Sequence, residues 1–68
     1  MTGTVYTETV VYSAPAAFAT EAPYQVIIVS LDGGGRITGR VAGERVQIGD
    51  RVSLAERRDT VPFFKRIP

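Results

Sequence analysis

Arginine carries most of the positive charge in this 68-residue chain, since seven of the eight basic residues are Arg and the eighth is Lys65. A guanidinium group favours planar, bidentate contact with a carboxylate or a phosphate. Arg36 and Arg40 lie in a segment of alternating polar and apolar residues, so we expect both to project from the outer side of one strand, about 7 Å apart. They are candidate anion-binding residues. The alternative is a solvated strand face, because acids interleave with the bases at Glu44, Asp50, Glu56 and Asp59.

The composition excludes most enzyme chemistry. The chain has no Cys and no His, which removes thiol nucleophiles, imidazole acid–base catalysis and zinc sites built from thiolate or imidazole. The serines therefore have no His partner, Lys65 is a lone amine near the C-terminus, and the carboxylates are scattered over different predicted turns and strands. We expect neither a catalytic residue nor a metal site.

A glycine-rich segment at residues 33–41 has one feature of a phosphate-binding loop. Gly34 and Gly39 have the spacing of the first two glycines of that motif, but Arg40 and Val41 stand where it requires Lys and Ser or Thr. The residues that follow also have a strand pattern, whereas the motif needs the N-terminus of a helix. We therefore interpret the glycines as a hairpin turn.

These side chains must be positioned by strands, because no stretch repeats apolar residues with helical spacing. Runs of β-branched and aromatic residues, and alternation of apolar with polar ones, predict five strands at residues 4–12, 24–31, 36–41, 51–57 and 61–66. Asp32 and the three glycines after it mark a tight turn. One helical turn is predicted between the first two strands, at Ala14 to Ala19.

Five short strands in so short a chain predict an all-β fold: a small five-stranded antiparallel barrel of the OB type, forming a single domain over residues 1–68, with an SH3-like barrel as the rival. The composition, 44% hydrophobic and 22% charged, is typical of a globular protein. No segment approaches the length of a membrane span or has a signal-peptide pattern, so we expect a cytoplasmic protein.

The second and fifth strands have more apolar residues than one barrel interior can cover. Val26 and Ile28 fall on the opposite side of the second strand from Ile27 and Val29, and a strand that is apolar on both faces must be covered twice. Adjacent residues in a strand also point to opposite faces, so one phenylalanine of the Phe63-Phe64 pair must point outward. These outward apolar residues are covered either by a neighbouring segment of the same chain or by a partner protein. The predicted partner interface comprises Phe18, Tyr24, Val26, Ile28, Phe63 and Phe64.

Several short segments, weak one by one, occur in an order that resembles one known family. This family is the C-terminal OB-fold domain of the zinc-ribbon/OB-fold proteins known as domain of unknown function thirty-five. The resemblance spans nearly the whole chain and is carried by Val-Tyr-Thr-x-Thr-Val-Val at 5–11, Ala14-Pro15 with Phe18, Ala22-Pro23-Tyr24, Leu31-Asp32-Gly33, Ile37-Thr38-Gly39-Arg40-Val41, Val46-x-Ile48-Gly49-x-x-Val52 and Pro62-x-Phe64.

The resemblance implies a role in acyl-CoA metabolism, since such proteins accompany thiolase-fold enzymes as scaffold or accessory subunits. We accordingly expect a non-catalytic accessory subunit of a thiolase-like enzyme, with Arg36 and Arg40 as possible contacts to the phosphates of CoA. Family members usually also carry a zinc ribbon with four Cys, and this chain has none.

Two other functions stay open. OB barrels often bind single-stranded nucleic acid through basic grooves and stacking aromatics, and the second half of the chain is basic: residues 1–34 carry three acids and no base (−3), and residues 35–68 carry eight bases and four acids (+4). Binders of this kind typically have a pI above about 9, whereas this chain has a pI near 8.2. The last alternative is a homo-oligomer in which a second copy covers the apolar face.

Overall fold

A computed structural model describes residues 1–12 and 23–68 of the chain. Its strands are β1 (Thr2–Val11), β2 (Tyr24–Leu31), β3 (Arg36–Val41), β4 (Arg51–Arg58) and β5 (Val61–Arg66). Three of these match the predicted ranges. The first strand begins two residues earlier than predicted because Thr2, Gly3 and Thr4 pair with β4, a contact distant in sequence that local pattern does not show.

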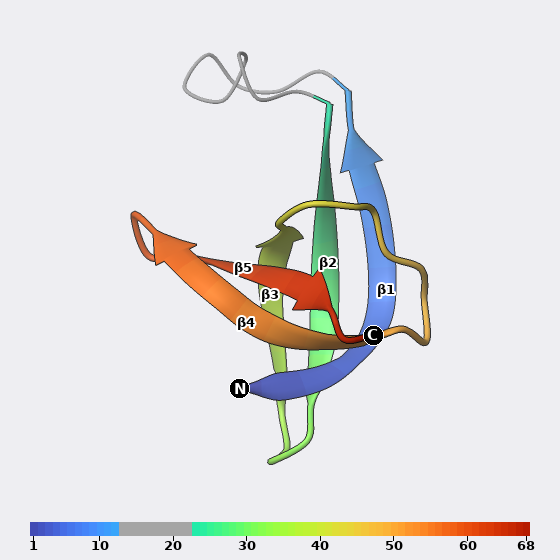
Figure 1. The fold of residues 1–68 in the computed structure, drawn as a ribbon, viewed down its shortest axis with the longest axis vertical. Helices are drawn as coiled ribbons and strands as arrows, with labels where there is room; N and C mark the ends of the chain where they lie inside the picture. The colour runs from blue at the N-terminus through green and yellow to red at the C-terminus, as the bar shows by residue number, and fades with distance from the viewer. Residues whose placement is uncertain (13–22) are drawn as a thin grey trace.

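The strands form a closed barrel in the order β1-β2-β3-β5-β4, with β4 returning to β1 (Figure 1). Strand β1 is shared by both halves of the barrel: its first residues pair with β4, and it pairs with β2 along most of its length. The predicted OB-type barrel is confirmed. One of the five pairings differs from the antiparallel expectation, because β3 and β5 run parallel at Arg40–Phe63 and Val41–Phe64.

The barrel interior is filled by alternate residues of the strands. The fully buried side chains are Val5, Ile27, Val29, Val52 and Phe64, and Val46 of the β3–β4 connection joins the same cluster. The predicted alternation of β3 is confirmed, since Gly39 is buried whereas Arg36 and Thr38 are exposed. The ring of Phe64 occupies the space above Gly39, where an added Cβ would lie 3.0 Å from Phe64 Cε2 and 2.7 Å from the Pro62 carbonyl oxygen.

The side chain of Gln25 in β2 holds the β3–β4 connection against the barrel through hydrogen bonds to Val46. Its side-chain amide donates to the Val46 carbonyl at 2.7 Å and accepts from the Val46 N–H at 2.9 Å. The same Nε2 also donates to a Glu8 carboxylate oxygen at 3.0 Å. Gln25 is only 5% exposed. Its side-chain amide supplies the hydrogen-bond partners that a neighbouring strand would otherwise give to the backbone of Val46.

Two predictions fall on residues 13–22. The helical turn from Ala14 to Ala19, and Phe18 as an interface residue, lie outside the described residues. Over the part of the chain that is described, the structure contains no helix of the length and apolar character that a membrane crossing requires.

Candidate interaction surface

The outer face of β1, β2 and β3 brings the predicted residues of the second and third strands together. Two rows of residues lie in register across the three strands. One row is Thr7, Ile28 and Thr38, and the next is Thr9, Val26 and Arg40. Val26 and Ile28 are half-buried and form an apolar strip between polar neighbours. We call this the β1–β2–β3 face; its members are Thr7, Thr9, Tyr6, Tyr24, Val26, Ile28, Arg36, Thr38 and Arg40.

Tyr6 and Arg36 form a stacked pair at one end of this face. The guanidinium carbon of Arg36 lies 3.9 Å from the centre of the Tyr6 ring, within the range of a cation–π contact. The β1–β2 register shifts between Val5 and Thr7, and such bulges redirect a side chain. The bulge explains how Tyr6 reaches from β1 toward β3, over the small Ser30 that pairs with Arg36.

Arg40 lies between two rings at the other end of the face. Its guanidinium carbon is 4.0 Å from the centre of the Tyr24 ring and 4.9 Å from that of Phe63. Arg58 of β4 lies 4.8 Å from the same Phe63 ring and donates to Glu56 at 2.6 Å. Four strands therefore contribute to one continuous series of stacked side chains. Arginine and aromatic side chains attract each other in this way because the ring face is electronegative.

These contacts correct part of the predicted partner interface. Phe63 does point outward, but it is only 5% exposed because arginines of the same chain cover it. Phe64 fills the barrel interior and is fully buried, so its side chain offers no surface to a partner. Tyr24, Val26 and Ile28 lie on the outer face as expected.

The spacing of Arg36 and Arg40 also differs from the expected 7 Å. They are four positions apart along β3, and the rise of about 3.3 Å per residue places their Cα atoms about 13 Å apart. They share a side of β3, but each is stacked on a different tyrosine.

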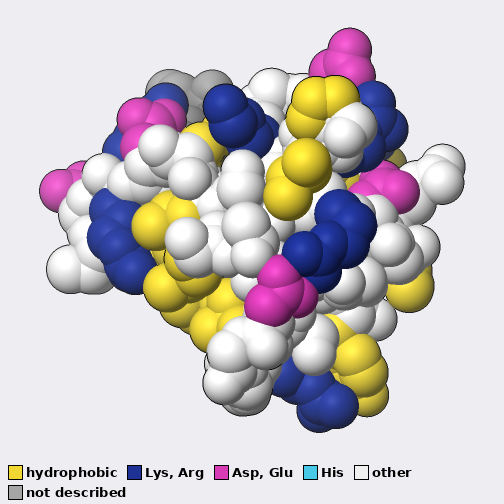
Figure 2. Space-filling view, turned by 60° about the horizontal axis from the view of Figure 1, so that its bottom comes forward, with side chains coloured by type: hydrophobic (Ala, Val, Ile, Leu, Met, Phe, Trp, Pro, Cys, Tyr) yellow, Lys and Arg dark blue, Asp and Glu magenta, His cyan; other side chains and the backbone are white. Residues whose placement is uncertain are grey.

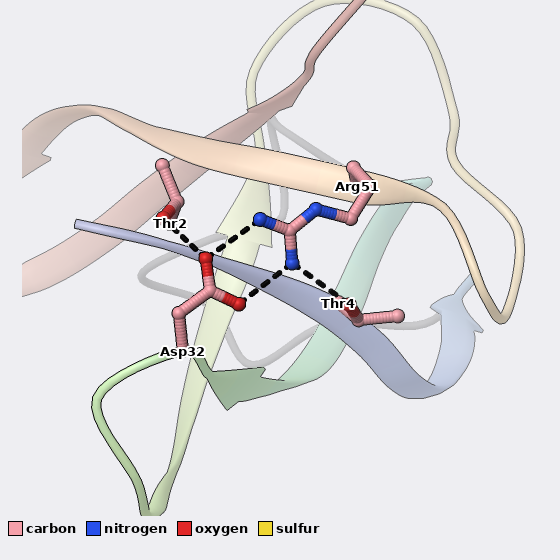
Figure 3. A network of polar contacts seen from close by, with 4 residues as sticks. All are labelled: Thr2, Thr4, Asp32 and Arg51. Atoms are coloured by element: carbon pink, nitrogen blue, oxygen red, sulfur yellow. Dashed lines mark hydrogen bonds and ion pairs between the residues drawn. The ribbon is translucent and has the colours of Figure 1, made fainter.

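A second polar site closes the barrel at the β2–β3 turn (Figure 3). Arg51 of β4 binds both carboxylate oxygens of Asp32, at 2.7 and 2.6 Å, and donates to Thr4 Oγ1 at 3.1 Å. Thr2 Oγ1 donates to Asp32 at 2.6 Å. The hydrogen bonds from Arg51 and Thr2 hold the pKa of the Asp32 carboxyl well below its usual range. The site joins the β2–β3 turn to β1 and β4, the two strands whose pairing closes the barrel.

Sequence reasoning missed these participants. Asp32 was assigned only to a turn and Arg51 only to an outward position, because their contact spans 19 residues and exists only once the barrel closes. Tyr6 was assigned only to a strand. No sequence signal marks Tyr6, because the break in alternation is visible only in the pairing of β1 with β2: two residues after the inward-facing Val5, Thr7 pairs with the outward-facing Ile28.

The distribution of charge over the surface is mixed. Figure 2 shows one face of the molecule, where basic, acidic and hydrophobic side chains lie close together and no broad field of one sign appears. Within residues 1–12 and 23–68, no group of three or more His, Cys, Asp or Glu side chains is placed to hold a metal ion.

Comparison with known proteins places this barrel in a family. Residues 1–57 match the family model described as the ChsH2 C-terminal OB-fold domain. The chain belongs to this family. The resemblance noted from the sequence is thereby confirmed.

Two further similarities lie within the same family. A DUF35 domain-containing scaffold protein from Methanocaldococcus jannaschii is 44% identical, over 82% of this chain and 42% of the relative. A solved structure described as the Ltp2-ChsH2(DUF35) aldolase matches with a TM-score of 0.73 and 32% identity, over 96% of this chain and 56% of that one. This ChsH2-type domain thus spans about half the length of the proteins it matches.

Proposed function

We propose that this chain acts as a non-catalytic OB-fold accessory domain that serves as a scaffold for a thiolase-like enzyme acting on acyl-CoA. The observation that carries the proposal is its 44% identity to a protein named as a scaffold. The likeness to a chain of an aldolase that carries ChsH2 in its name supports a role beside an enzyme. The thiolase-like partner and the acyl-CoA substrate rest on the family resemblance.

The geometry is consistent with a binding role. The strongest polar site, around Asp32 and Arg51, joins elements of the barrel to one another. The β1–β2–β3 face instead presents half-buried apolar residues beside stacked arginines, and interfaces commonly combine such an apolar centre with Arg and Tyr.

The test is capture of partners from the native source with the tagged chain, followed by mass spectrometry and reconstitution. We expect a thiolase-fold enzyme to be retained in a fixed molar ratio, and to co-elute with the chain in size-exclusion chromatography. An unrelated OB-fold domain with the same tag is the control. If no enzyme of acyl-CoA metabolism is retained above that control, the proposal is wrong.

Direct contact with CoA forms a second part of the proposal. Of the two predicted phosphate contacts, Arg36 and Arg40, we retain Arg40, since a hollow at its end of β3 is lined in part by Tyr24, Arg40 and Arg45. Calorimetry on the reconstituted complex compares CoA with dephospho-CoA. We expect weaker binding of dephospho-CoA and a further loss with Arg40→Ala. Equal affinities for both ligands, unchanged by that substitution, would remove CoA contact from the proposal.

A further inference from the structure

We propose that the β1–β2–β3 face binds a carboxylate-bearing segment of the partner protein, with the Tyr6–Arg36 pair as its anchor. This inference rests on the proposed function and deepens it, since it names the surface and the chemistry of the recognised segment. It differs from the sequence-based expectation, in which an exposed apolar surface made the contact.

Arg36 makes no ion pair among the residues that the structure describes. Arg51, Arg58 and Arg66 each bind a carboxylate, at 2.6, 2.6 and 3.2 Å. Arg36 is exposed and held against Tyr6, 3.9 Å from the ring centre. Stacking uses the flat side of the guanidinium, whereas the N–H donors lie in its plane and can bind a carboxylate with two parallel hydrogen bonds.

Preorganisation makes this arginine a better anchor than a free one. A long side chain that is immobilised on binding loses conformational freedom, and the contact with Tyr6 already restricts Arg36. Arg57 is also exposed, but no ring contact with it is found in the described part of the chain. It therefore serves as a matched control of equal charge.

The surroundings of Arg36 complete a protein-binding surface. Ile28 and Val26 provide a half-buried apolar strip beside it, and Thr38 and Thr7 flank Ile28 in register with hydroxyl groups. Both charged members of this face, Arg36 and Arg40, are basic. Charge complementarity thus favours an acidic segment with an apolar residue between its carboxylates.

The same observations favour a protein over a single nucleic-acid strand. Nucleic-acid bases bind such barrels by stacking on open ring faces, but guanidinium groups lie over the rings of Tyr6, Tyr24 and Phe63. Phe63 is also almost entirely buried.

The test uses a poly-L-glutamate peptide as the probe, titrated into the isotopically labelled chain and followed by NMR of the backbone amides and the arginine Nε–Hε groups. At low ionic strength, where exposed charges are little screened, we expect the largest shifts at Arg36 and along β2 and β3. Arg36→Ala should weaken binding about tenfold, equivalent to roughly 1.4 kcal/mol. Arg57→Ala should change it less than twofold.

Three variants test whether the bidentate, ring-stacked geometry of Arg36 is needed in addition to its charge. Arg36→Lys keeps the charge but loses the bidentate geometry, so it should behave like Arg36→Ala. Tyr6→Phe keeps the ring and should bind as the unchanged chain does, whereas Tyr6→Ala should weaken the binding. Equal losses for Arg36→Ala and Arg57→Ala, or shifts centred elsewhere, would overturn the proposal. So would tighter binding of an oligothymidylate of equal charge, which would favour the nucleic-acid function.

Failure of this inference can be distinguished from failure of the proposed function. If Arg36→Ala captures the partner enzyme as well as the unchanged chain does, the interface lies on another face and only this inference is wrong. If the acidic peptide binds at Arg36 but no acyl-CoA enzyme is captured, the surface stands and the proposed function does not.

Discussion

Arginine side chains serve two different purposes on this barrel, and their partners decide which. Arg51 is held by the Asp32 carboxylate and two threonines, so it joins strands. Arg36 and Arg40 lie against rings and face outward. The side-chain type alone does not separate the two purposes, because both kinds of arginine occupy outward positions of a strand.

Asp32→Asn should lower the free energy of unfolding at neutral pH and reduce its dependence on pH. The pKa of Asp32 is lowered in the folded state, so its contribution is present above the ordinary carboxyl pKa of about 3.9 and is lost as the pH falls below that value. Urea unfolding at pH 7 and at successively lower pH measures this. Asp59→Asn, in an exposed turn, is the control; a parallel pH dependence in the Asp32 variant and the unchanged chain would contradict the assignment.

Both side chains of the Asp32–Arg51 pair are 48% exposed. Added salt should therefore also reduce the difference in the free energy of unfolding between the Asp32 variant and the unchanged chain.

Gln25→Leu should destabilise the fold although it retains the approximate size of the side chain. It leaves the N–H and carbonyl groups of Val46 without the hydrogen bonds that Gln25 now makes, and each buried unsatisfied group costs about 1–3 kcal/mol. Chemical denaturation measures the loss, with Gln47→Ala at an exposed neighbouring position as control. Equal stability of the Gln25 and Gln47 variants would show that water satisfies Val46 equally well.

Individual elements carry local strain and close contacts that their sequences do not indicate. The β4–β5 hairpin turns through Asp59 and Thr60 at φ of 48° and 70°, and a two-residue turn of this kind favours Gly at its second position. A β-branched residue is rarely found in this left-handed region. Barrel closure thus overrides local preference at this turn.

Thr60→Gly should raise the free energy of unfolding by about 1 kcal/mol. The left-handed conformation costs a non-glycine residue about 1–2 kcal/mol, and the larger conformational entropy that Gly loses on folding offsets part of the gain. Thermal and urea unfolding measure the change, and Thr60→Ala, which keeps the Cβ, should gain less. A Gly variant no more stable than the Ala variant would show that Thr60 adopts this conformation without strain.

Gly39→Ala should weaken the contact between β3 and β5. The new Cβ would lie 2.7 Å from the Pro62 carbonyl oxygen and 3.0 Å from the Phe64 ring, and overpacking of a core costs about 1–3 kcal/mol. Gly33→Ala is the control, because an added Cβ there meets no atom within 4 Å. Comparable stabilities of the two variants would mean that β3 and β5 can move apart at little cost.

The molecule as a whole is a closed barrel in which the chain's own arginines cover the outward-facing Phe63, whereas Tyr6 and Tyr12 stay exposed, at 51% and 73%. That arrangement removes the strongest sequence argument for an apolar interface, namely the outward Phe63, because Arg40 and Arg58 cover it. It also leaves the outer surface with charges of both signs close together (Figure 2).

The intact chain should not bind single-stranded nucleic acid tightly. Its pI near 8.2 and its interleaved acids are unlike those of basic OB-fold binders. Fluorescence anisotropy with a labelled oligonucleotide at near-physiological salt should show no binding in the micromolar range. Micromolar or tighter binding that falls steeply with added salt would contradict this and support the nucleic-acid function.

The sequence by itself determined the elements and the fold class. The five strands, the glycine turn at Asp32 and the apolar outer side of β2 all follow from alternation and residue type, because these depend on neighbours along the chain. The order of short segments also identified the family.

Only the tertiary structure decided which side chains meet. The parallel β3–β5 pairing, the Asp32–Arg51 pair and the stacking of Arg40 on Tyr24 and Phe63 join residues that are far apart in sequence. A strand pattern states which side of a strand a residue faces, but it does not state which strand lies alongside. The register of barrel closure settles that, and it placed Phe64 inside, covered Phe63, and left Arg36 stacked on Tyr6 at the outer face.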